Sequence, residues 1–318
     1  MDRKQSAIIR IIAWSVTAIA LCCIMFIGLR GGFSNIGGSI LFSGSGDYYK
    51  HADKYQAGET KIQGNKVKDL SVNWVDGSVN VEIYDGDTNQ LSEVSNRKLE
   101  KKEQLHYYNE NGKLNIQYQK SGKRILSSFW KGSRRLDKQL TVKIPVQTVS
   151  SLGTVSVDTV SSDNRIEGVS AQKIKLDSVS GDFTLVNCRA SDLSMDSTSG
   201  SLSSENLIVK RKVETNTTSG DVTLEGKFVK LDLDSVSGDM DIDSGLCPKD
   251  VSTDTTSGDV VLRIPDNEGF TYEKDTVSGS LKCDFPVKQW EDKGSYKEGK
   301  ASFRFDTVNG DINIKKRK

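Results

Sequence analysis

Hydrophobic and polar positions follow one recurring pattern along the second half of the chain. Each copy reads approximately D-S/T-V/T-S-G-D-x-x-L/I, and its glycine, which we call the corner position, aligns the copies. The corner position holds Ser162 in a degenerate first copy, then Gly181, Gly200, Gly220, Gly238, Gly258, Gly279 and Gly310. Successive copies are 19, 19, 20, 18, 20, 21 and 31 residues apart. A period near 20 residues is typical of one coil of a β-solenoid and too short for most helical repeats.

Two hydrophobic columns predict the core. Seven residues before the corner stand Val155, Ile174, Leu193, Val213, Leu231, Val251, Tyr272 and Phe303. Two residues after it stand Phe183, Leu202, Val222, Met240, Val260, Leu281 and Ile312. Because side chains alternate between the two faces of a strand, the small residues three and one before the corner are predicted to point inward as well.

These small residues form two further columns. Three before the corner stand Thr159, Ser178, Ser197, Thr217, Ser235, Thr255, Thr276 and Thr307. One before it stand Ser161, Ser180, Ser199, Ser219, Ser237, Ser257, Ser278 and Asn309. We expect them to fill a narrow end of the coil, with hydroxyls bonding along each column.

The glycine and the residue after it predict a turn. Inward positions step by three residues across the corner instead of two, and glycine has the dihedral freedom that a sharp turn needs. A second, looser corner is expected at Gly168, Gly226 and Gly245. The predicted fold class is therefore all-β, a parallel β-solenoid of about eight coils with a period of ~20 residues over residues 148–318.

The same frame appears once upstream, around Gly77. Leu70 and Val72 occupy its first core positions, and Trp74 replaces the small Ser/Thr, where a bulky side chain would plug the narrow end. We therefore interpret residues 66–147 as an atypical β capping region. The final coil ends in "KKRK", whose charges are expected to discourage pairing at an open edge.

The N-terminus contains a long apolar run. Residues 11–29 carry no charge over 19 residues, which as a helix would span about 28 Å, close to the bilayer core. A cleaved signal peptide is the alternative, but no A-x-A-like site follows the run. Arg3, Lys4 and Arg10 precede it, so the positive-inside rule predicts a cytoplasmic tail (1–10), a single transmembrane helix (11–29), a Gly/Ser-rich tether (30–65) and an extracellular C-terminal domain.

Two aspartate columns are the strongest candidates for chemistry. One lies four before the corner: Asp158, Asp177, Asp196, Asn216, Asp234, Asp254, Asp275 and Asp306. The other lies just after it: Asp163, Asp182, Ser201, Asp221, Asp239, Asp259, Ser280 and Asp311. Carboxylates stacked at about 4.8 Å would repel by roughly 0.9 kcal/mol per pair in water. Either Ca²⁺ bridges them, or, as we favour, they accept turn N–H bonds and are screened by solvent and lysines.

Outside these columns, no residues suggest catalysis, a resident metal or a cofactor. His51 and His106 lie outside the repeats, and no H-E-x-x-H, G-x-S-x-G or P-loop occurs. Some glycan-cleaving enzymes use paired carboxylates on a β-helix, but aspartate in almost every coil indicates a structural position. Cys22 and Cys23 lie in the span; Cys188, Cys247 and Cys283 are expected to be small buried residues, with one disulfide as the alternative.

The run "LTVKIP" followed by the repeated units, behind one membrane span, resembles the putative-adhesin family of LiaG-like bacterial envelope proteins. The resemblance covers residues from about 66 to the end. It implies a β-strand-repeat domain outside the membrane, an adhesin-like role and relatives in envelope-stress systems, and it brings no catalytic residues. The long interval from 279 to 310, with "WEDKGSYKEGK" inserted, departs from the period and is expected to be a surface loop.

Charge is spread unevenly. Residues 151–318 hold 22 Lys/Arg and 29 Asp/Glu, whereas residues 1–150 hold 22 and 14. Segment 123–138, with Phe129 and Trp130, concentrates positive charge; it is either a contact for anionic headgroups and wall polymers or a solvated loop. The sequence thus favours a membrane-anchored, non-catalytic interaction or scaffold module of the cell envelope. Its expected partners are the membrane, envelope proteins and anionic wall polymers, but not nucleic acid. A component of envelope-stress sensing or regulation is the alternative.

Overall fold

The structure, a computed structural model, describes residues 49, 51–121, 136–149 and 152–317. The described chain forms two compact units, one ending at Gly181 and the other beginning at Asp182. Strands dominate both units, as the repeat predicted. The predicted tail (1–10) and span (11–29) lie outside the described residues. No helix within the described ranges is long and apolar enough to cross a membrane.

The first unit is built around the long strand β3. Its elements are η1 (Ala52–Lys54), β1 (Gln56–Ala57), β2 (Thr60–Gln63), η2 (Gly64–Lys66), β3 (Asp69–Tyr84), β4 (Thr88–Ser95), β5 (His106–Glu110), β6 (Lys113–Gln117), β7 (Lys138–Pro145), α3 (Val146–Val149), β8 (Leu152–Glu167) and β9 (Ser170–Ser178). β3 pairs in parallel with β8, with Trp74 beside Thr159 and Gly77 beside Ser162. The upstream coil predicted around Gly77 is therefore confirmed in the frame of the later repeats.

The other side of β3 carries the cap. β3 pairs in parallel with β6 along its first half and with β7 along its second half. Beyond these, β5 and β4 add antiparallel pairs, and β1 and β2 follow on the outside. The region 66–147 therefore combines parallel and antiparallel pairs, unlike the later coils. The assignment of 30–65 as a tether was wrong for its last part, because β1 and β2 extend the cap's sheets.

The second unit consists of stacked parallel coils. Its strands are β10 (Phe183–Val186), β11 (Arg189–Ser197), β12 (Leu202–Ser219), β13 (Val222–Phe228), β14 (Lys230–Ser237), β15 (Met240–Ser244), β16 (Asp250–Ser257), β17 (Val260–Ile264), β18 (Gly269–Ser278), β19 (Leu281–Cys283), β20 (Lys288–Trp290), β21 (Lys293–Lys297), β22 (Ala301–Asn309) and β23 (Ile312–Lys316). Equivalent repeat positions are neighbours, as with Val213, Leu231 and Val251. Both hydrophobic columns are buried, except that Leu281 is half-buried.

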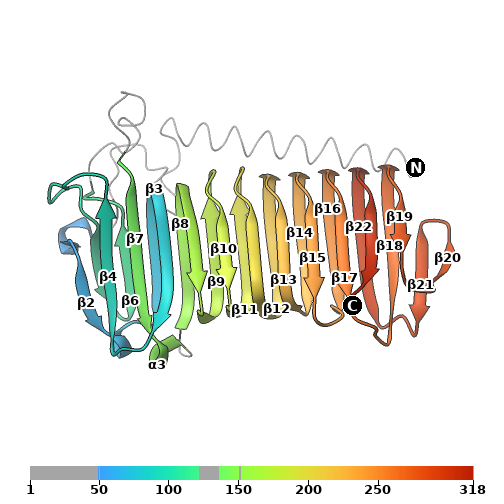
Figure 1. The fold of residues 1–318 in the computed structure, drawn as a ribbon, viewed down its shortest axis with the longest axis horizontal. Helices are drawn as coiled ribbons and strands as arrows, with labels where there is room; N and C mark the ends of the chain where they lie inside the picture. Colours follow the sequence, from blue (N-terminus) through green and yellow to red (C-terminus); the bar gives the residue numbers. More distant parts are fainter. Residues whose placement is uncertain (1–48, 50, 122–135, 150–151, 318) are drawn as a thin grey trace. The chain divides into compact units, whose positions relative to one another are not determined.

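The coils are not stacked in chain order. β22 lies between β16 and β18, and β23 lies between β17 and β19, so the last coil of the sequence is internal and the β18–β19 coil is outermost (Figure 1). The expected surface loop between 279 and 310 is instead the antiparallel hairpin β20–β21, whose second strand pairs with β18. The expectation that "KKRK" guards an open edge was also wrong, since Lys315 and Lys316 pair with β17.

The corner differs from its predicted geometry. The residues three before it are mostly buried, but the serines one before it are exposed, apart from half-buried Ser161, because the chain already turns there. The glycine is buried at Gly181, Gly200 and Gly220 and half-buried at Gly238 and Gly258. A Cβ on Gly258 would lie 2.1 Å from the carbonyl oxygen of Gly238, and a Cβ on Gly238 would lie 2.3 Å from that of Gly220. Both glycines also have positive φ, 147° at Gly258 and 154° at Gly238, so the predicted dihedral freedom and the close approach of the neighbouring coil's backbone both require glycine.

The inward hydroxyls do not bond along their column. In two coils the corner N–H donates to the hydroxyl three residues earlier, at 2.7 Å for both Ser178 and Ser197. Thr217, Ser235, Thr255 and Thr307 have no hydrogen-bond partner among the described residues. Neighbouring strands are about 4.8 Å apart, which exceeds the length of a hydrogen bond between equivalent hydroxyls.

Candidate functional site

The aspartates just after the corner form a hydrogen-bonded ladder across the coils of the second unit. Each side-chain oxygen accepts a hydrogen bond from the backbone N–H of the equivalent residue in the next coil. The N···O distances are 2.8 Å from Ser201 to Asp182, 2.9 Å from Asp239 to Asp221, 2.9 Å from Asp259 to Asp239, 2.7 Å from Asp311 to Asp259 and 2.8 Å from Ser280 to Asp311. The favoured interpretation, in which these carboxylates accept turn N–H bonds, fits this geometry, although the donor belongs to the neighbouring coil.

The two serines in this column fit the same ladder. Ser201 Oγ accepts the N–H of Asp221 at 3.2 Å, so a hydroxyl replaces the carboxylate as acceptor. Ser280 belongs to the outermost coil, and its hydroxyl donates to Asp311 at 3.0 Å. Hydrogen bonds from the backbone and the hydroxyl of Ser280 lower the pKa of Asp311. The ladder therefore follows the spatial order of the coils and not their order in the chain.

The aspartates four before the corner lie on a more enclosed face. Asp158 is beside Asp177 in the first unit, and burial together with a hydrogen bond to Asp177 raises the pKa of Asp158 to about 7. In the second unit burial and the nearby Asp232 and Asp254 raise the pKa of Asp234 to about 6. Each of these two carboxyls therefore holds a proton at a higher pH than a free aspartate.

Cations screen the remaining charge of this face. Lys212 contacts Asp232 of the next coil at 2.7 Å, Lys230 contacts Asp250 at 2.6 Å, and Arg304 contacts Asp306 at 2.8 Å. No group of three or more His, Cys, Asp or Glu side chains in the described ranges could hold a metal ion. The geometry thus gives no support to the Ca²⁺ interpretation of the columns.

A buried ion pair in the cap was not foreseen from the sequence. The Lys138 ammonium is fully buried and lies 2.8 Å from a carboxylate oxygen of Glu93, whose side chain is 5% exposed. It also donates to the carbonyls of Glu103 and Tyr118 and lies 4.8 Å from the Trp74 ring centre. Burial lowers the pKa of Lys138 to about 8, and Glu93 opposes that shift.

This ion pair changes the interpretation of the basic segment. The alternation of β7 places Lys138 in phase with the buried Leu140, Val142 and Ile144, which is the signal that the sequence offered. Lys138 therefore contributes no surface charge to segment 123–138. The rest of that segment, up to residue 135 and including Phe129 and Trp130, lies outside the described residues.

The cysteines and histidines of the described ranges do not cluster with one another. Cys188 is buried, and Cys247 and Cys283 are half-buried free thiols. Burial raises the pKa of Cys247 to about 11, which keeps it protonated. His51 is exposed on the edge of the cap, and burial lowers the pKa of His106, whose Nδ1 lies 2.9 Å from the Gln104 carbonyl.

Comparison with known proteins agrees with the parallel coils and their repeat frame. The family model described as Toastrack DUF4097 matches residues 67–315. The chain belongs to the Toastrack family. The match begins at Val67, just before β3, and ends within β23, so it spans both units and includes the intercalated last coil.

Two solved structures are similar to this Toastrack chain at low identity. One is a putative cell adhesion protein from Clostridium sporogenes, 15% identical, covering 83% of this chain and 100% of that chain with a TM-score of 0.30. The other is a putative adhesin from Bacteroides fragilis, 14% identical, covering 82% and 97% with a TM-score of 0.43. No curated protein matches the chain.

Proposed function

We propose that this Toastrack chain is a membrane-anchored, extracytoplasmic interaction module of the bacterial cell envelope that carries out no catalysis. The observation that supports this most is the aspartate ladder. The most conspicuous repeated polar group of the sequence is engaged in bonds between coils, as from Asp259 N to Asp239 at 2.9 Å. A side chain that satisfies a backbone N–H in coil after coil serves the framework, whereas a catalytic pair would be singular.

The anchor and the orientation are proposed from the sequence. The uncharged run 11–29 serves as the transmembrane helix, and Arg3, Lys4 and Arg10 keep the first ten residues in the cytoplasm. The two units then lie outside the cell. Labelling of single engineered cysteines in intact cells tests this topology. A cysteine at exposed Ser257 should react with a membrane-impermeant maleimide, whereas one at Ser6 should react only after lysis; the reverse pattern overturns the orientation.

The proposed partners are anionic wall polymers or envelope proteins, contacted through segment 123–138. Five cationic residues of this segment remain after buried Lys138 is set aside: Lys123, Arg124, Lys131, Arg134 and Arg135. Replacing all five by Gln should reduce retention of the purified chain on isolated wall polymer, because phosphate-rich polymers attract clustered cations.

A matched control removes the same charge elsewhere. Five exposed lysines of the second unit are replaced by Gln: Lys210, Lys227, Lys282, Lys288 and Lys315. Retention should stay near that of the unaltered chain. Equal loss in both variants would show that only net charge matters and would reject the segment as the contact.

The resemblance to LiaG-like envelope proteins favours a second candidate, a component of envelope-stress sensing or regulation. Under this candidate, a signal received outside the cell would pass to a partner protein in the membrane. Deleting the gene should change induction of a stress reporter by wall-active agents under this candidate. If the deletion leaves induction unchanged but abolishes polymer binding, the stress candidate is rejected and the interaction module is retained.

A further inference from the structure

The C-terminal coil, β22–β23, fills a slot between two coils that precede it in the chain. β22 pairs in parallel with β16 and with β18, and β23 pairs in parallel with β17 and with β19. Phe303, Phe305, Ile312 and Ile314 are each at most 1% exposed in this position. The slot therefore has two walls, β16–β17 and β18–β19, and the insert provides a continuous layer of core between them (Figure 1).

β22–β23 pairs with both neighbouring coils at equivalent repeat positions. The three coils align residue for residue, seven before the corner as Val251, Phe303 and Tyr272, and three before it as Thr255, Thr307 and Thr276. The aspartate ladder continues through the insert, from Asp259 to Asp311 to Ser280. A second copy of the same protein carries an identical coil, which offers β16–β17 and β18–β19 the same register and the same corner.

Residues 298–300 form a short connector between β21 and β22. β21 ends at Lys297 and β22 begins at Ala301. Lys297 is a non-glycine residue with φ of 46°, and Gly299 has φ of 65°. A left-handed conformation is unfavourable for lysine, and an extended connector would not require it.

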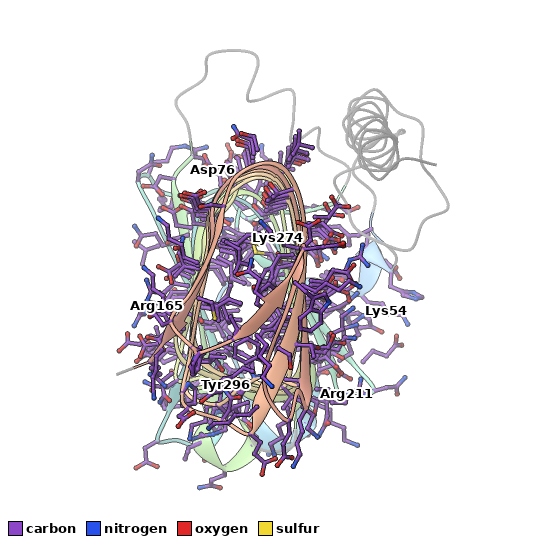
Figure 2. All side chains as sticks on the ribbon, turned by 90° about the vertical axis from the view of Figure 1, so that its right-hand side faces the viewer. Lys54, Asp76, Arg165, Arg211, Lys274 and Tyr296 are labelled. Carbon is purple, nitrogen blue, oxygen red and sulfur yellow. The ribbon has the colours of Figure 1, made fainter. Side chains whose placement is uncertain are left out.

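The order of the chain leaves the slot open during folding. β16–β17 and β18–β19 are joined by residues 265–268, whereas the hairpin β20–β21 separates the insert from both walls. Contacts between segments close in the chain form sooner than distant ones. The outer wall, β18–β19, can therefore complete its pairing only after β22–β23 has folded. Figure 2 shows this end of the stack, with Lys274 of β18 and Tyr296 of β21 labelled. Exchange of an identical element between chains is a characteristic misassembly of repeat proteins and a low-cost route to dimers.

We propose that β22–β23 is exchanged between two copies of this chain, each completing the slot of the other to form a strand-swapped dimer. The exchanged coil makes the same pairings and buries the same four core residues, so the interface is the slot itself. The partner is a second copy, selected by register and by the ladder. This inference stands apart from the proposed envelope role.

The first test alters the connector in the full-length chain. Deleting Gly299 and Lys300 should prevent the coil from folding back into its own slot, and light scattering should then give twice the mass of one chain. Inserting a flexible stretch of four Gly and Ser residues after Gly299 should instead give a single-chain mass. A shortened variant that folds as a single chain overturns the proposal.

The second test locates the exchanged coil. Ser252 of β16 and Arg304 of β22 are register partners, so cysteines at both positions should cross-link in a chain whose native cysteines are replaced by Ala or Ser. An exchanged coil gives a link between chains on a non-reducing gel. A matched control places cysteines at Asp232 and Ser252, partners in coils that do not exchange, and should link within one chain.

The same cross-link can be formed in a chain whose connector is unaltered. The proposal can therefore still be tested if the shortened variant fails to fold. The Ser252–Arg304 cysteine pair is formed after refolding at increasing protein concentration. Links between chains that increase with concentration, while the control pair stays within one chain, support exchange. Links that stay within one chain at every concentration overturn it.

Discussion

Replacing Lys138 by Met should destabilise the first unit by about 3–5 kcal/mol, because it leaves Glu93 buried without a counter-charge. The Lys138 side chain is 0% exposed, and Glu93, 2.8 Å away, is 5% exposed, so water cannot compensate for the lost ammonium. The carbonyls of Glu103 and Tyr118 also lose their donor. Urea unfolding, with hydrogen exchange at the amides of β6 and β7, measures the cap separately from the second unit.

A control on the same strand makes the measurement decisive. Lys143 pairs with Glu82 at 2.9 Å, close to the buried distance, but the two side chains are 40% and 32% exposed. Lys143→Met should therefore cost only about 0–1 kcal/mol. Adding Glu93→Gln to Lys138→Met should recover stability, since Gln keeps an acceptor for the Leu105 N–H, which lies 2.6 Å from Glu93 Oε1. A loss at Lys138 no larger than the loss at Lys143 would refute the reasoning.

Three further predictions concern the coils. Gly238→Val should reduce the free energy of unfolding by about 1–3 kcal/mol or more, because even a Cβ there lies 2.3 Å from the Gly220 carbonyl oxygen. The melting temperature should fall accordingly, and an unchanged melting temperature contradicts this. Asp239→Ala should cost about 0.5 kcal/mol and speed exchange of the Asp259 amide, which loses its 2.9 Å acceptor, whereas unchanged exchange rejects the ladder. Asp158 has a folded pKa of about 7, above its unfolded value, so stability should fall as pH rises from about 4 to 7; Asp158→Asn should reduce that slope in melts across this range.

The recurring pattern predicted the core because each coil repeats the same local solution. A side chain seven residues before a corner meets its equivalents in both neighbouring coils, so every copy of the column carries the same requirement to be apolar. Val213, Leu231 and Val251 are all fully buried for this reason. The coil around Gly77 was found by the same rule, far from the other repeats, since its frame of hydrophobic and small positions matches theirs.

Three features could not be derived from the pattern. Alternation assigns the residue before each corner to the inward face, but the chain bends there, so Ser237 and Ser257 are exposed. Glycine at the corner predicted unusual dihedrals, which Gly238 and Gly258 have, but the pattern did not reveal that a neighbouring carbonyl also leaves no room for a side chain there. The buried partner of Lys138 comes from β4, and no periodicity links Glu93 to a lysine 45 positions later.

By itself, the sequence determined that this chain is a stack of parallel coils, which side chains form its core and where each coil turns. Those properties depend on the local pattern of each repeat, which is written in every copy. Only the tertiary structure decided the order of the coils. β22 and β18 carry the same repeat frame, so that frame alone does not show which of them pairs with β16. The choice depends on how the hairpin β20–β21 returns the chain and on the contacts that the whole stack makes, which no single repeat encodes.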